Sequence, residues 1–220
     1  VTKSFRVPGN WMSLGKPEDK PVPSLPVDPF SDAPLKTVVT PWQSSQQILE
    51  AKGVPFAAGA SAIFDPATST LRVTNTAMPM DLVEQVIVRR AIGQALGALG
   101  LARKAGKLAL GAAKVDSAVR SGEALVVLHA YEAAEDGVRK VTQARRAVAH
   151  LGGPKIAAYK LFSEAELGLA LGGTNVIHAA VLAQDAGRAV LKRMVALDRY
   201  RGAAPDDRLT VQAIAAEDTE

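Results

Sequence analysis

The sequence predicts an α/β protein: a C-terminal three-layer α/β/α sandwich with a mostly parallel sheet of about four strands, preceded by a small α/β module and a proline-rich arm. Two observations support this prediction. Over residues 89–202, short apolar runs that are typical of buried strands alternate with stretches in which apolar residues recur every three to four positions. Strands that alternate with helices favour a mostly parallel sheet covered by helices on both faces.

Proline and charge divide the chain into four segments. Eight of the thirteen prolines lie between Pro8 and Pro41, in a polar stretch that is typical of a linker or an irregular arm. Beyond residue 202 the sequence carries five acidic side chains and one basic side chain. The expected segments are a proline-rich arm or linker over 1–39, a small βαββα-like module over 40–88, an α/β/α domain over 89–202 and an acidic, flexible tail over 203–220.

Capping and turn signals outline the small module. Thr40 and Gln43 have the spacing of a capping box and predict the start of a short helix, which Gly53 ends. Residues 60–64 and 70–75 are predicted strands, joined by the turn sequence DPATS. The module is therefore expected to hold one short helix and a hairpin.

A long helical pattern links the module to the larger domain. Apolar residues keep a three-to-four spacing over residues 80–102, although Gly93, Gly97 and Gly100 weaken this helix and leave a break there as an alternative. The strands predicted after this helix cover residues 108–110, 124–130, 156–159 and 176–182. Four helices are predicted between and after them: one begins at Gly111, one covers 132–149, one covers 167–171 after a capping box formed by Ser163 and Glu166, and one begins at Asp185. On the helix over 132–149, four basic residues are expected to face outward: Arg139, Lys140, Arg145 and Arg146.

Positive charge is concentrated in the larger domain. Residues 89–202 carry 18 basic and 9 acidic side chains, whereas residues 1–88 carry 7 and 8. A local excess of this size suits nucleic acid or an anionic membrane surface, although a basic domain can also be merely soluble. The aromatic content of 5% disfavours a single-strand binder that stacks bases on aromatic rings.

The residue inventory argues against catalysis and metal binding. The chain has no cysteine, which excludes disulfides, thiolate zinc sites and a thiol nucleophile. The only candidates for acid–base or metal chemistry are His129, His150 and His178, and the first and last of these lie in apolar strand patterns that are typical of core histidines. Nucleotide-binding and Gly-x-Ser-x-Gly motifs are absent. We therefore expect no enzyme activity, no cofactor and no metal, and the lack of an apolar run of about 18 residues predicts no membrane insertion.

The stretch over residues 99–122 combines cations, glycines and an apolar helical face. Arg103, Lys104 and Lys107 cluster where one helix is expected to end, and Gly111 begins a helix that carries Lys114. A glycine at a strand-to-helix junction lets the backbone approach a ligand closely, and the N–H groups at the start of a helix favour anions. The phosphates of RNA are the expected ligand, and an ordinary solvated face of lysines is the alternative.

Residues from about 81 to 202 resemble a known family. The motifs are LGLARKAGKLALG, VDSAVRSG, ALVVLHA and LFSEAELGLALGGTNVIHAAVL. They resemble the bacterial nucleic-acid-binding proteins of the YlxR/YlxQ type, whose C-terminal domain is similar to the kink-turn-binding ribosomal proteins of the large subunit. The resemblance implies a cytoplasmic, ribosomal-protein-like module that binds structured, ribosome-related RNA.

The same resemblance implies which residues hold the RNA. In that family RNA is held by the strand-to-helix junction and by a loop before the last strand. The ribosomal members place a polar Asn-Glu pair just after the junction glycine, where this chain has Ala112 and Ala113, so weak or altered kink-turn specificity is expected. The implied RNA-binding residues are Arg103, Lys104, Lys107, Gly111, Lys114, Gly172, Gly173, Thr174 and Asn175.

The first half of the chain bears a second resemblance. Residues 48–76, with the hairpin sequence DPATSTLRVTNT, are similar to the ring-building modules at the periplasmic end of secretins, and VTKSFRVP fits as a strand that precedes such a module. This resemblance implies an alternative function as a structural or interaction component of an envelope secretion ring. It would place the chain in the periplasm and predict self-association through the N-terminal module.

Overall fold

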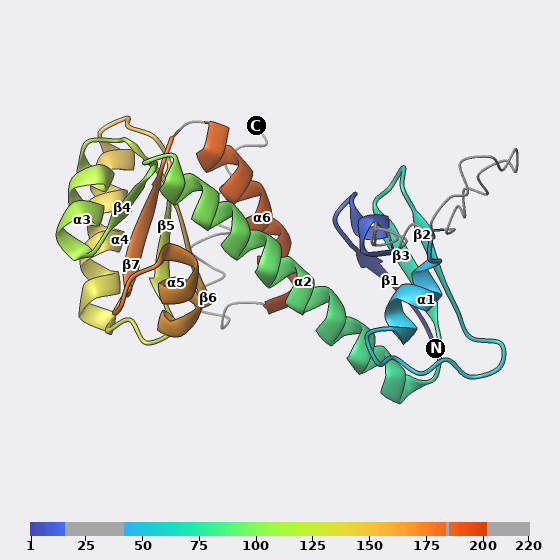
Figure 1. The fold of residues 1–220 in the computed structure, drawn as a ribbon. Helices are drawn as coiled ribbons and strands as arrows, with labels where there is room; N and C mark the ends of the chain where they lie inside the picture. The colour runs from blue at the N-terminus through green and yellow to red at the C-terminus, as the bar shows by residue number, and fades with distance from the viewer. Residues whose placement is uncertain (16–41, 184, 202–220) are drawn as a thin grey trace, which may run out of the picture. The chain divides into compact units, whose positions relative to one another are not determined.

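A computed structural model describes residues 1–15, 42–183 and 185–201. The chain divides into two compact units, Val1–Ile87 and Val88–Glu220, and this division lies next to the predicted boundary after residue 88. Figure 1 shows the elements of each unit. Most of the proline-rich arm and the whole acidic tail over 203–220 lie outside the described residues.

The first unit is a small antiparallel sheet with two short helices. Its three strands, β1 (Thr2–Arg6), β2 (Ser61–Asp65) and β3 (Thr70–Thr74), lie in the order β1-β3-β2 with antiparallel pairing throughout. The helices are η1 (Trp11–Gly15) and α1 (Ser45–Glu50). Its buried hydrophobic side chains include Phe5, Trp11, Ile48, Leu49, Leu71 and Val73.

Two expectations for the first unit need correction. Residues 2–15 belong to the sheet and its core rather than to a proline-rich arm, because β1 pairs with the free edge of β3 and Trp11 is fully buried. Thr40 of the predicted capping box lies outside the described residues, and the helix begins later than predicted, at Ser45, with reciprocal bonds between Ser44 and Gln47. The same Ser/Thr-x-x-Gln spacing occurs twice within eight residues, so local sequence alone did not choose between them.

The second unit contains a four-stranded sheet. Its strands are β4 (Leu108–Leu110), β5 (Ala124–Ala130), β6 (Ala157–Phe162) and β7 (His178–Leu182), in the order β4-β7-β5-β6. Its helices are α3 (Ala112–Arg120), α4 (Glu135–His150), α5 (Glu164–Leu171) and α6 (Asp185–Arg201), together with the C-terminal part of α2 (Ala77–Lys104). The α/β class is therefore confirmed.

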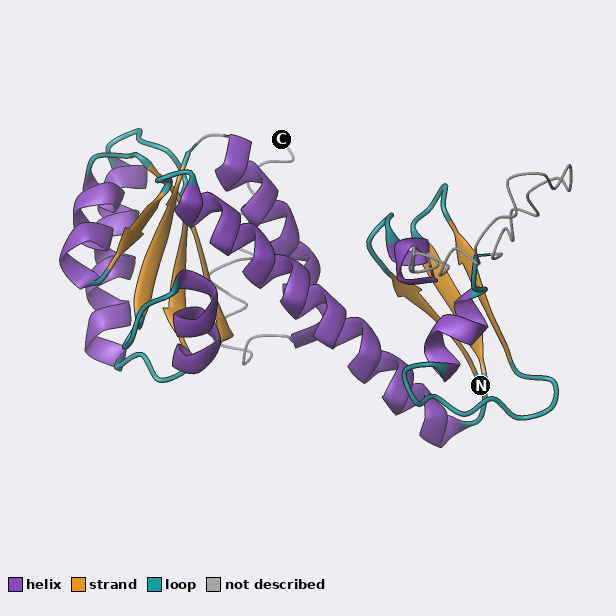
Figure 2. Cartoon of the chain, in the orientation of Figure 1, coloured by secondary structure: helices purple, strands orange, loops and turns teal. Residues whose placement is uncertain are grey.

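Helices cover both faces of this sheet, as the three-layer prediction requires (Figure 2). One core packs α3 and α4 against the sheet through residues such as Val115, Val119 and Val141. The other packs α2, α5 and α6 against the opposite face through residues such as Leu99 and Leu167. Successive residues of β7 alternate between these cores, because side chains along a strand point to opposite faces.

The expectation of a mostly parallel sheet holds for strand direction and is wrong for strand pairing. The strands β4, β5 and β6 run in one direction, but β7 runs against them and lies between β4 and β5. Only the β5–β6 pair is therefore parallel. The apolar periodicity of a strand is the same in both directions, so it does not predict whether the strand runs parallel or antiparallel to its neighbours. The short helix α5 and the loop after it bring β7 in from the opposite end.

The long helix α2 is continuous over 28 residues, so the alternative of a break at its glycines is not realised. A buried stripe that includes Ala91, Ala95, Leu99 and Ala102 holds the helix against the core of the second unit. Burial of this stripe offsets the low helix propensity of the glycines. Among the described residues, no helix combines the length and the apolar character that crossing a bilayer requires.

Two glycines should respond oppositely to alanine. A Cβ at Gly93 would meet nothing within 4 Å, so Gly93→Ala should stabilise the second unit by about 1 kcal/mol through helix propensity. A Cβ at Gly168 would lie 2.7 Å from the carbonyl oxygen of Gly173, so Gly168→Ala should destabilise the unit by about 1–3 kcal/mol. Urea unfolding of the two variants checks this, and equal changes of the same sign would contradict the packing described for α5.

Candidate nucleic-acid interface

The junction between β4 and α3 is built around Gly111. Its backbone has φ of +86°, a conformation that L side chains rarely adopt, and a Cβ there would meet nothing within 4 Å. Backbone conformation rather than lack of space therefore explains the glycine. The Gly111 N–H donates a 3.0 Å hydrogen bond to the carbonyl of His178, and the Gly111 carbonyl accepts from Val115.

The N-terminus of α3 is exposed and has no negative charge of its own. No side chain caps it, no acidic residue lies in its first turn, and Ala112, Ala113 and Lys114 are all exposed. The first N–H groups of a helix have no partner within the helix, and its N-terminus carries a partial positive charge. The helices α4, α5 and α6 each have an acidic residue in the first turn. Among the described helices that begin in this unit, α3 alone presents an unneutralised N-terminus.

The loop between α5 and β7 is held in a defined shape. Gly172 ends α5 in the left-handed conformation, and the N–H of Gly173 donates to the carbonyl of Gly168 at 3.1 Å. Asn175 also has a positive φ, of 58°, which asparagine tolerates better than most residues. Val176 is buried, whereas Thr174 and Asn175 are exposed. The loop therefore presents two polar side chains from a fixed backbone.

Strand pairing brings the junction and the loop to the same end of the sheet. Leu110 lies opposite Ala179 in the β4–β7 ladder, and the Gly111–His178 hydrogen bond continues that ladder by one step. His178 directly follows the loop. The strand-to-helix junction therefore lies beside the first residue of β7, three residues after Asn175.

Lys107 and Lys104 precede β4 rather than α3. The carbonyl of Lys107 accepts from the N–H of Leu182, so Lys107 flanks the opposite end of β7 from His178. Four steps of extended chain lead from Lys107 to Gly111, about 13 Å at roughly 3.3 Å per residue. Lys104, at the end of α2, lies beside Leu169 and Ala170 of α5. The backbone of Lys107 is therefore one strand length away from Gly111.

Arg103 reaches the loop from α2. Its Nη1 atom lies 3.7 Å from the position that a Cβ would take on Gly172. The structure therefore brings one cation of the α2 C-terminus next to the glycines that precede β7. Sequence reasoning placed Arg103 in the site without this contact, because spacing along the chain does not reveal how far a long side chain reaches.

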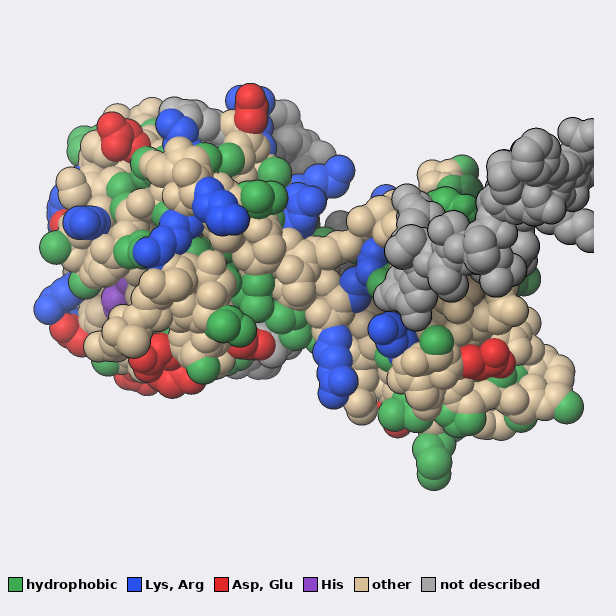
Figure 3. Space-filling view, viewed as in Figure 1, with side chains coloured by type: hydrophobic (Ala, Val, Ile, Leu, Met, Phe, Trp, Pro, Cys, Tyr) green, Lys and Arg blue, Asp and Glu red, His purple; other side chains and the backbone are tan. Residues whose placement is uncertain are grey.

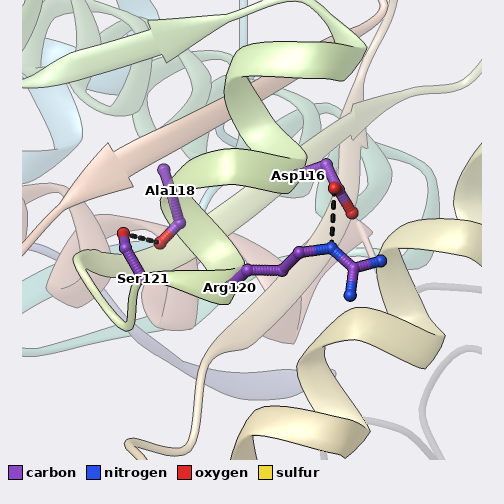
Figure 4. A network of polar contacts seen from close by, with 4 residues as sticks. All are labelled: Asp116, Ala118, Arg120 and Ser121. Atoms are coloured by element: carbon purple, nitrogen blue, oxygen red, sulfur yellow. Dashed lines mark hydrogen bonds and ion pairs between the residues drawn. The ribbon is translucent and has the colours of Figure 1, made fainter.

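The predicted cations have no acidic partners among the described residues. Ion pairs neutralise other cations of the unit: Arg120 binds Asp116 at 2.8 Å within α3 (Figure 4), and Arg139 and Lys140 both bind Asp136. No such pair involves the cations predicted to bind RNA, which are Arg103, Lys104, Lys107 and Lys114. Figure 3 shows blue Lys and Arg side chains across the middle of the face that presents α2 and α5. These charges remain available to an anionic ligand.

A pair of buried histidines lies behind the junction. His129 on β5 and His178 on β7 are cross-strand partners, and their Nδ1 atoms form a 2.8 Å hydrogen bond. The His129 Nε2 atom is buried and has no hydrogen-bond partner among the described residues. A Cβ on Gly137, at the start of α4, would lie 2.8 Å from the His178 Nε2 atom. The prediction of core histidines is confirmed for this pair, and His150 is exposed.

Burial disfavours the charged form of both rings of this pair. Desolvation, with smaller contributions from the charges of His178, Arg145 and Lys160, lowers the pKa of His129 to about 3, and desolvation also lowers the pKa of His178. The Nδ1–Nδ1 hydrogen bond needs one unprotonated nitrogen, so the two rings cannot both be cationic in this arrangement. No group of three or more acidic or histidine side chains in the described part of the chain could hold a metal ion.

Arg145 differs from its prediction. Together with Arg139, Lys140 and Arg146 it was expected to face outward, but it is buried, and its Nε donates a 2.7 Å hydrogen bond to the carbonyl of Ile156. Burial, with a smaller effect of Arg146, lowers its pKa to about 10. The side chain satisfies a backbone carbonyl at the entry to β6, a role that apolar periodicity does not detect.

The histidine pair predicts a pH dependence of stability. Both folded-state pKa values lie below the unfolded value near 6.5, so the unfolded chain binds protons first and stability falls as the pH drops below about 6.5. Each histidine that stays neutral in the fold should contribute about 1.4 kcal/mol per pH unit in that window. The free energy of unfolding can be measured with urea between pH 7 and pH 5, with NMR signals of β5 and β7 as the probe. It should change less with pH in His129→Gln than in the wild type. A His129→Gln slope equal to that of the wild type would contradict the account.

Several solved structures are similar to this chain, and two of them share about a fifth of its residues over the matched part. No family model and no curated protein matches the chain. A protein of unknown function from Bacillus halodurans is 22% identical, with a TM-score of 0.42 over 46% of this chain and 97% of that chain. The 15.5 kD RNA-binding protein of Giardia lamblia is 20% identical, with a TM-score of 0.40 over 50% of this chain and 90% of that chain. The YlxR/YlxQ resemblance stays a prediction.

Proposed function

We propose that the second unit binds structured RNA through the N-terminus of α3 and the loop over 172–175, with Arg103 at the edge of this surface. The observation that supports the proposal is the Gly111–His178 hydrogen bond, which ties the residue before an unneutralised helix N-terminus to the start of β7, the strand that follows the exposed polar loop. Backbone N–H groups at a helix N-terminus are ready ligands for a phosphate. Lys114, which has no acidic partner among the described residues, adds a full positive charge beside them.

The two parts of the surface suit different parts of an RNA. The α3 N-terminus and the nearby cations suit the phosphates, which supply affinity and register without reading sequence. Thr174 and Asn175 carry exposed hydrogen-bonding groups, which suit base edges or 2′-hydroxyl groups. RNA with an exposed loop or bulge can meet both parts at once, whereas a regular A-form duplex hides its base edges in a deep, narrow groove.

We also propose that this binding is ribosome-related and only weakly selective for kink-turns. The methyl groups of Ala112 and Ala113 stand where the resembling ribosomal proteins have Asn and Glu, so they offer no hydrogen bonds to base edges. Phosphate contacts do not depend on those side chains. Lys107, one strand length from Gly111, and Lys104, at the end of α2, contribute through the long-range field rather than by direct contact.

The proposed function involves no catalysis. The two histidines nearest the surface are buried and bonded to each other, and burial holds their pKa values low, which suits a structural role. Phosphate binding by backbone N–H groups needs neither a general base nor a cofactor. Incubation of labelled RNA with the protein should therefore leave the RNA intact.

A salt series tests the surface. The logarithm of the binding constant should fall linearly with the logarithm of salt concentration, and each lost phosphate contact should reduce the slope by about 0.7–0.9. Lys114→Ala and Arg103→Ala should each flatten the slope in gel-shift titrations, whereas Lys107→Ala should change it less. The matched control is Arg139→Ala, because Arg139 is already paired with Asp136. If only Arg139→Ala changed the salt dependence of binding, the RNA would contact α4 instead of the proposed surface.

A charge placed in the first turn of α3 should separate stability from binding. Ala113→Glu should stabilise the helix by about 0.3–1 kcal/mol, because a carboxylate complements the helix dipole. The same carboxylate should repel phosphate and weaken RNA binding severalfold. Ala113→Gln, with a similar shape and no charge, is the control. RNA affinity equal in the two variants would show that phosphate does not approach the α3 N-terminus.

The alternative function, a component of a secretion ring, predicts self-association of the first unit. Among the described residues, its sheet ends at β1 on one edge and at β2 on the other, and Ile63 on β2 is exposed. Native mass measurement separates the proposals: a ring component assembles into large oligomers, whereas the proposed RNA-binding function predicts a small species.

A further inference from the structure

An apolar groove lies on the face of the second unit that carries α2 and α5. Its volume is about 360 Å³, and its lining includes Gly97, Gly100, Leu101, Lys104, Leu169 and Ala170. The two helices approach closely, since a Cβ on Gly100 would lie 3.4 Å from the carbonyl oxygen of Ala170. None of the residues that line this groove belongs to α3 or to the loop over 172–175.

The groove exposes large apolar side chains next to cations. Leu101 is 68% exposed and Leu169 is 87% exposed, and covering them would release about 25 cal/mol per Å² of apolar surface. Lys104 lines the groove, and Arg103 lies beside Gly172 at the end of α5. Neither cation forms an ion pair with a described residue. A matching ligand therefore needs apolar side chains flanked by negative charge.

We propose that residues 203–220 of the same chain bind in this groove. In their sequence Leu209, Val211 and Ile214 lie between the acidic pairs Asp206–Asp207 and Glu217–Asp218. This order of acidic, apolar and acidic residues complements an apolar groove flanked by cations. The segment as a whole carries five acidic residues and one basic residue.

The segment is long enough to reach the groove. It follows α6, which ends at Arg201 in the same unit. Eighteen residues span up to about 60 Å when extended, at roughly 3.3 Å each, which exceeds the width of a domain of this size. Attachment to the same chain gives the segment an effective concentration in the millimolar range, so weak contacts suffice.

Docking of the segment has a consequence for RNA that rests on the proposed function. The acidic side chains of the segment would form ion pairs with Arg103 and so lower the positive potential over the RNA surface. RNA and the segment 203–220 would then compete, and only RNA with enough phosphate contacts would displace the segment. The segment would therefore weaken the binding of non-specific RNA more than the binding of RNA that makes many phosphate contacts.

Disulfide trapping in the full chain tests the docking directly. The chain has no cysteine, so engineered pairs report without background. Leu169→Cys combined with Ile214→Cys should form an intramolecular disulfide at least tenfold faster than Leu151→Cys combined with Ile214→Cys. Leu151 is the matched control: it is 85% exposed and follows α4, on the opposite face of the sheet. Both replaced leucines are exposed, so neither change should disturb the fold.

A second set of variants separates this inference from the proposed function. Neutralising the five acidic residues with Asn or Gln should slow the Leu169→Cys trapping at least threefold and raise RNA affinity severalfold. Equal trapping rates at Leu169 and Leu151, or a disulfide-linked dimer as the main product, would overturn the docking whatever the RNA data show. Tenfold selectivity with no RNA binding in any variant would support the docking and overturn the proposed function.

Discussion

The pairing of β4 with β7 determines how the candidate site is assembled. Its last step, the hydrogen bond from Gly111 to His178, couples two segments that are more than sixty residues apart in the chain. One segment leads into the bare N-terminus of α3, and the other follows the loop over 172–175. His178 also contacts His129 through its ring and lies against Gly137 of α4. The relative positions of helix and loop therefore depend on one short antiparallel ladder and the polar pair behind it.

The N-terminus of α3 lacks stabilising features that other helices of this unit have. The N-cap of α5 is a complete capping box, whereas α3 begins with a glycine that has a positive φ and no side-chain cap. A capping side chain contributes about 1 kcal/mol, and an acidic first turn adds a few tenths more. Positions that forgo such gains, without a packing reason, are where functional demands are expected. At Gly111 the positive φ accounts for the glycine, so the gain that is forgone without a structural reason is an acidic residue in the first turn of α3.

Sequence reasoning found most elements because each has a local signal. The apolar run of β5 and the capping box of α5 are examples, and both lie where they were predicted. The errors concern information that is not local. The insertion of β7 between β4 and β5 depends on which end of the sheet the chain enters, and the periodicity of a strand is the same in either direction. The burial of Arg145 depends on a carbonyl eleven residues away. Lys107 was grouped with Gly111 because they are close in sequence, but an extended strand separates them.

The central claim is that RNA contacts the α3 N-terminus and the loop before β7 together. NMR titration of the ¹⁵N-labelled chain with a structured RNA tests it most directly, because backbone amides at both places report independently. The account predicts that the amide signals of Ala112, Ala113 and Lys114 shift in parallel with those of Thr174 and Asn175, with one shared dissociation constant. Shifts confined to the exposed face of α4, with both of these groups unchanged, would contradict it.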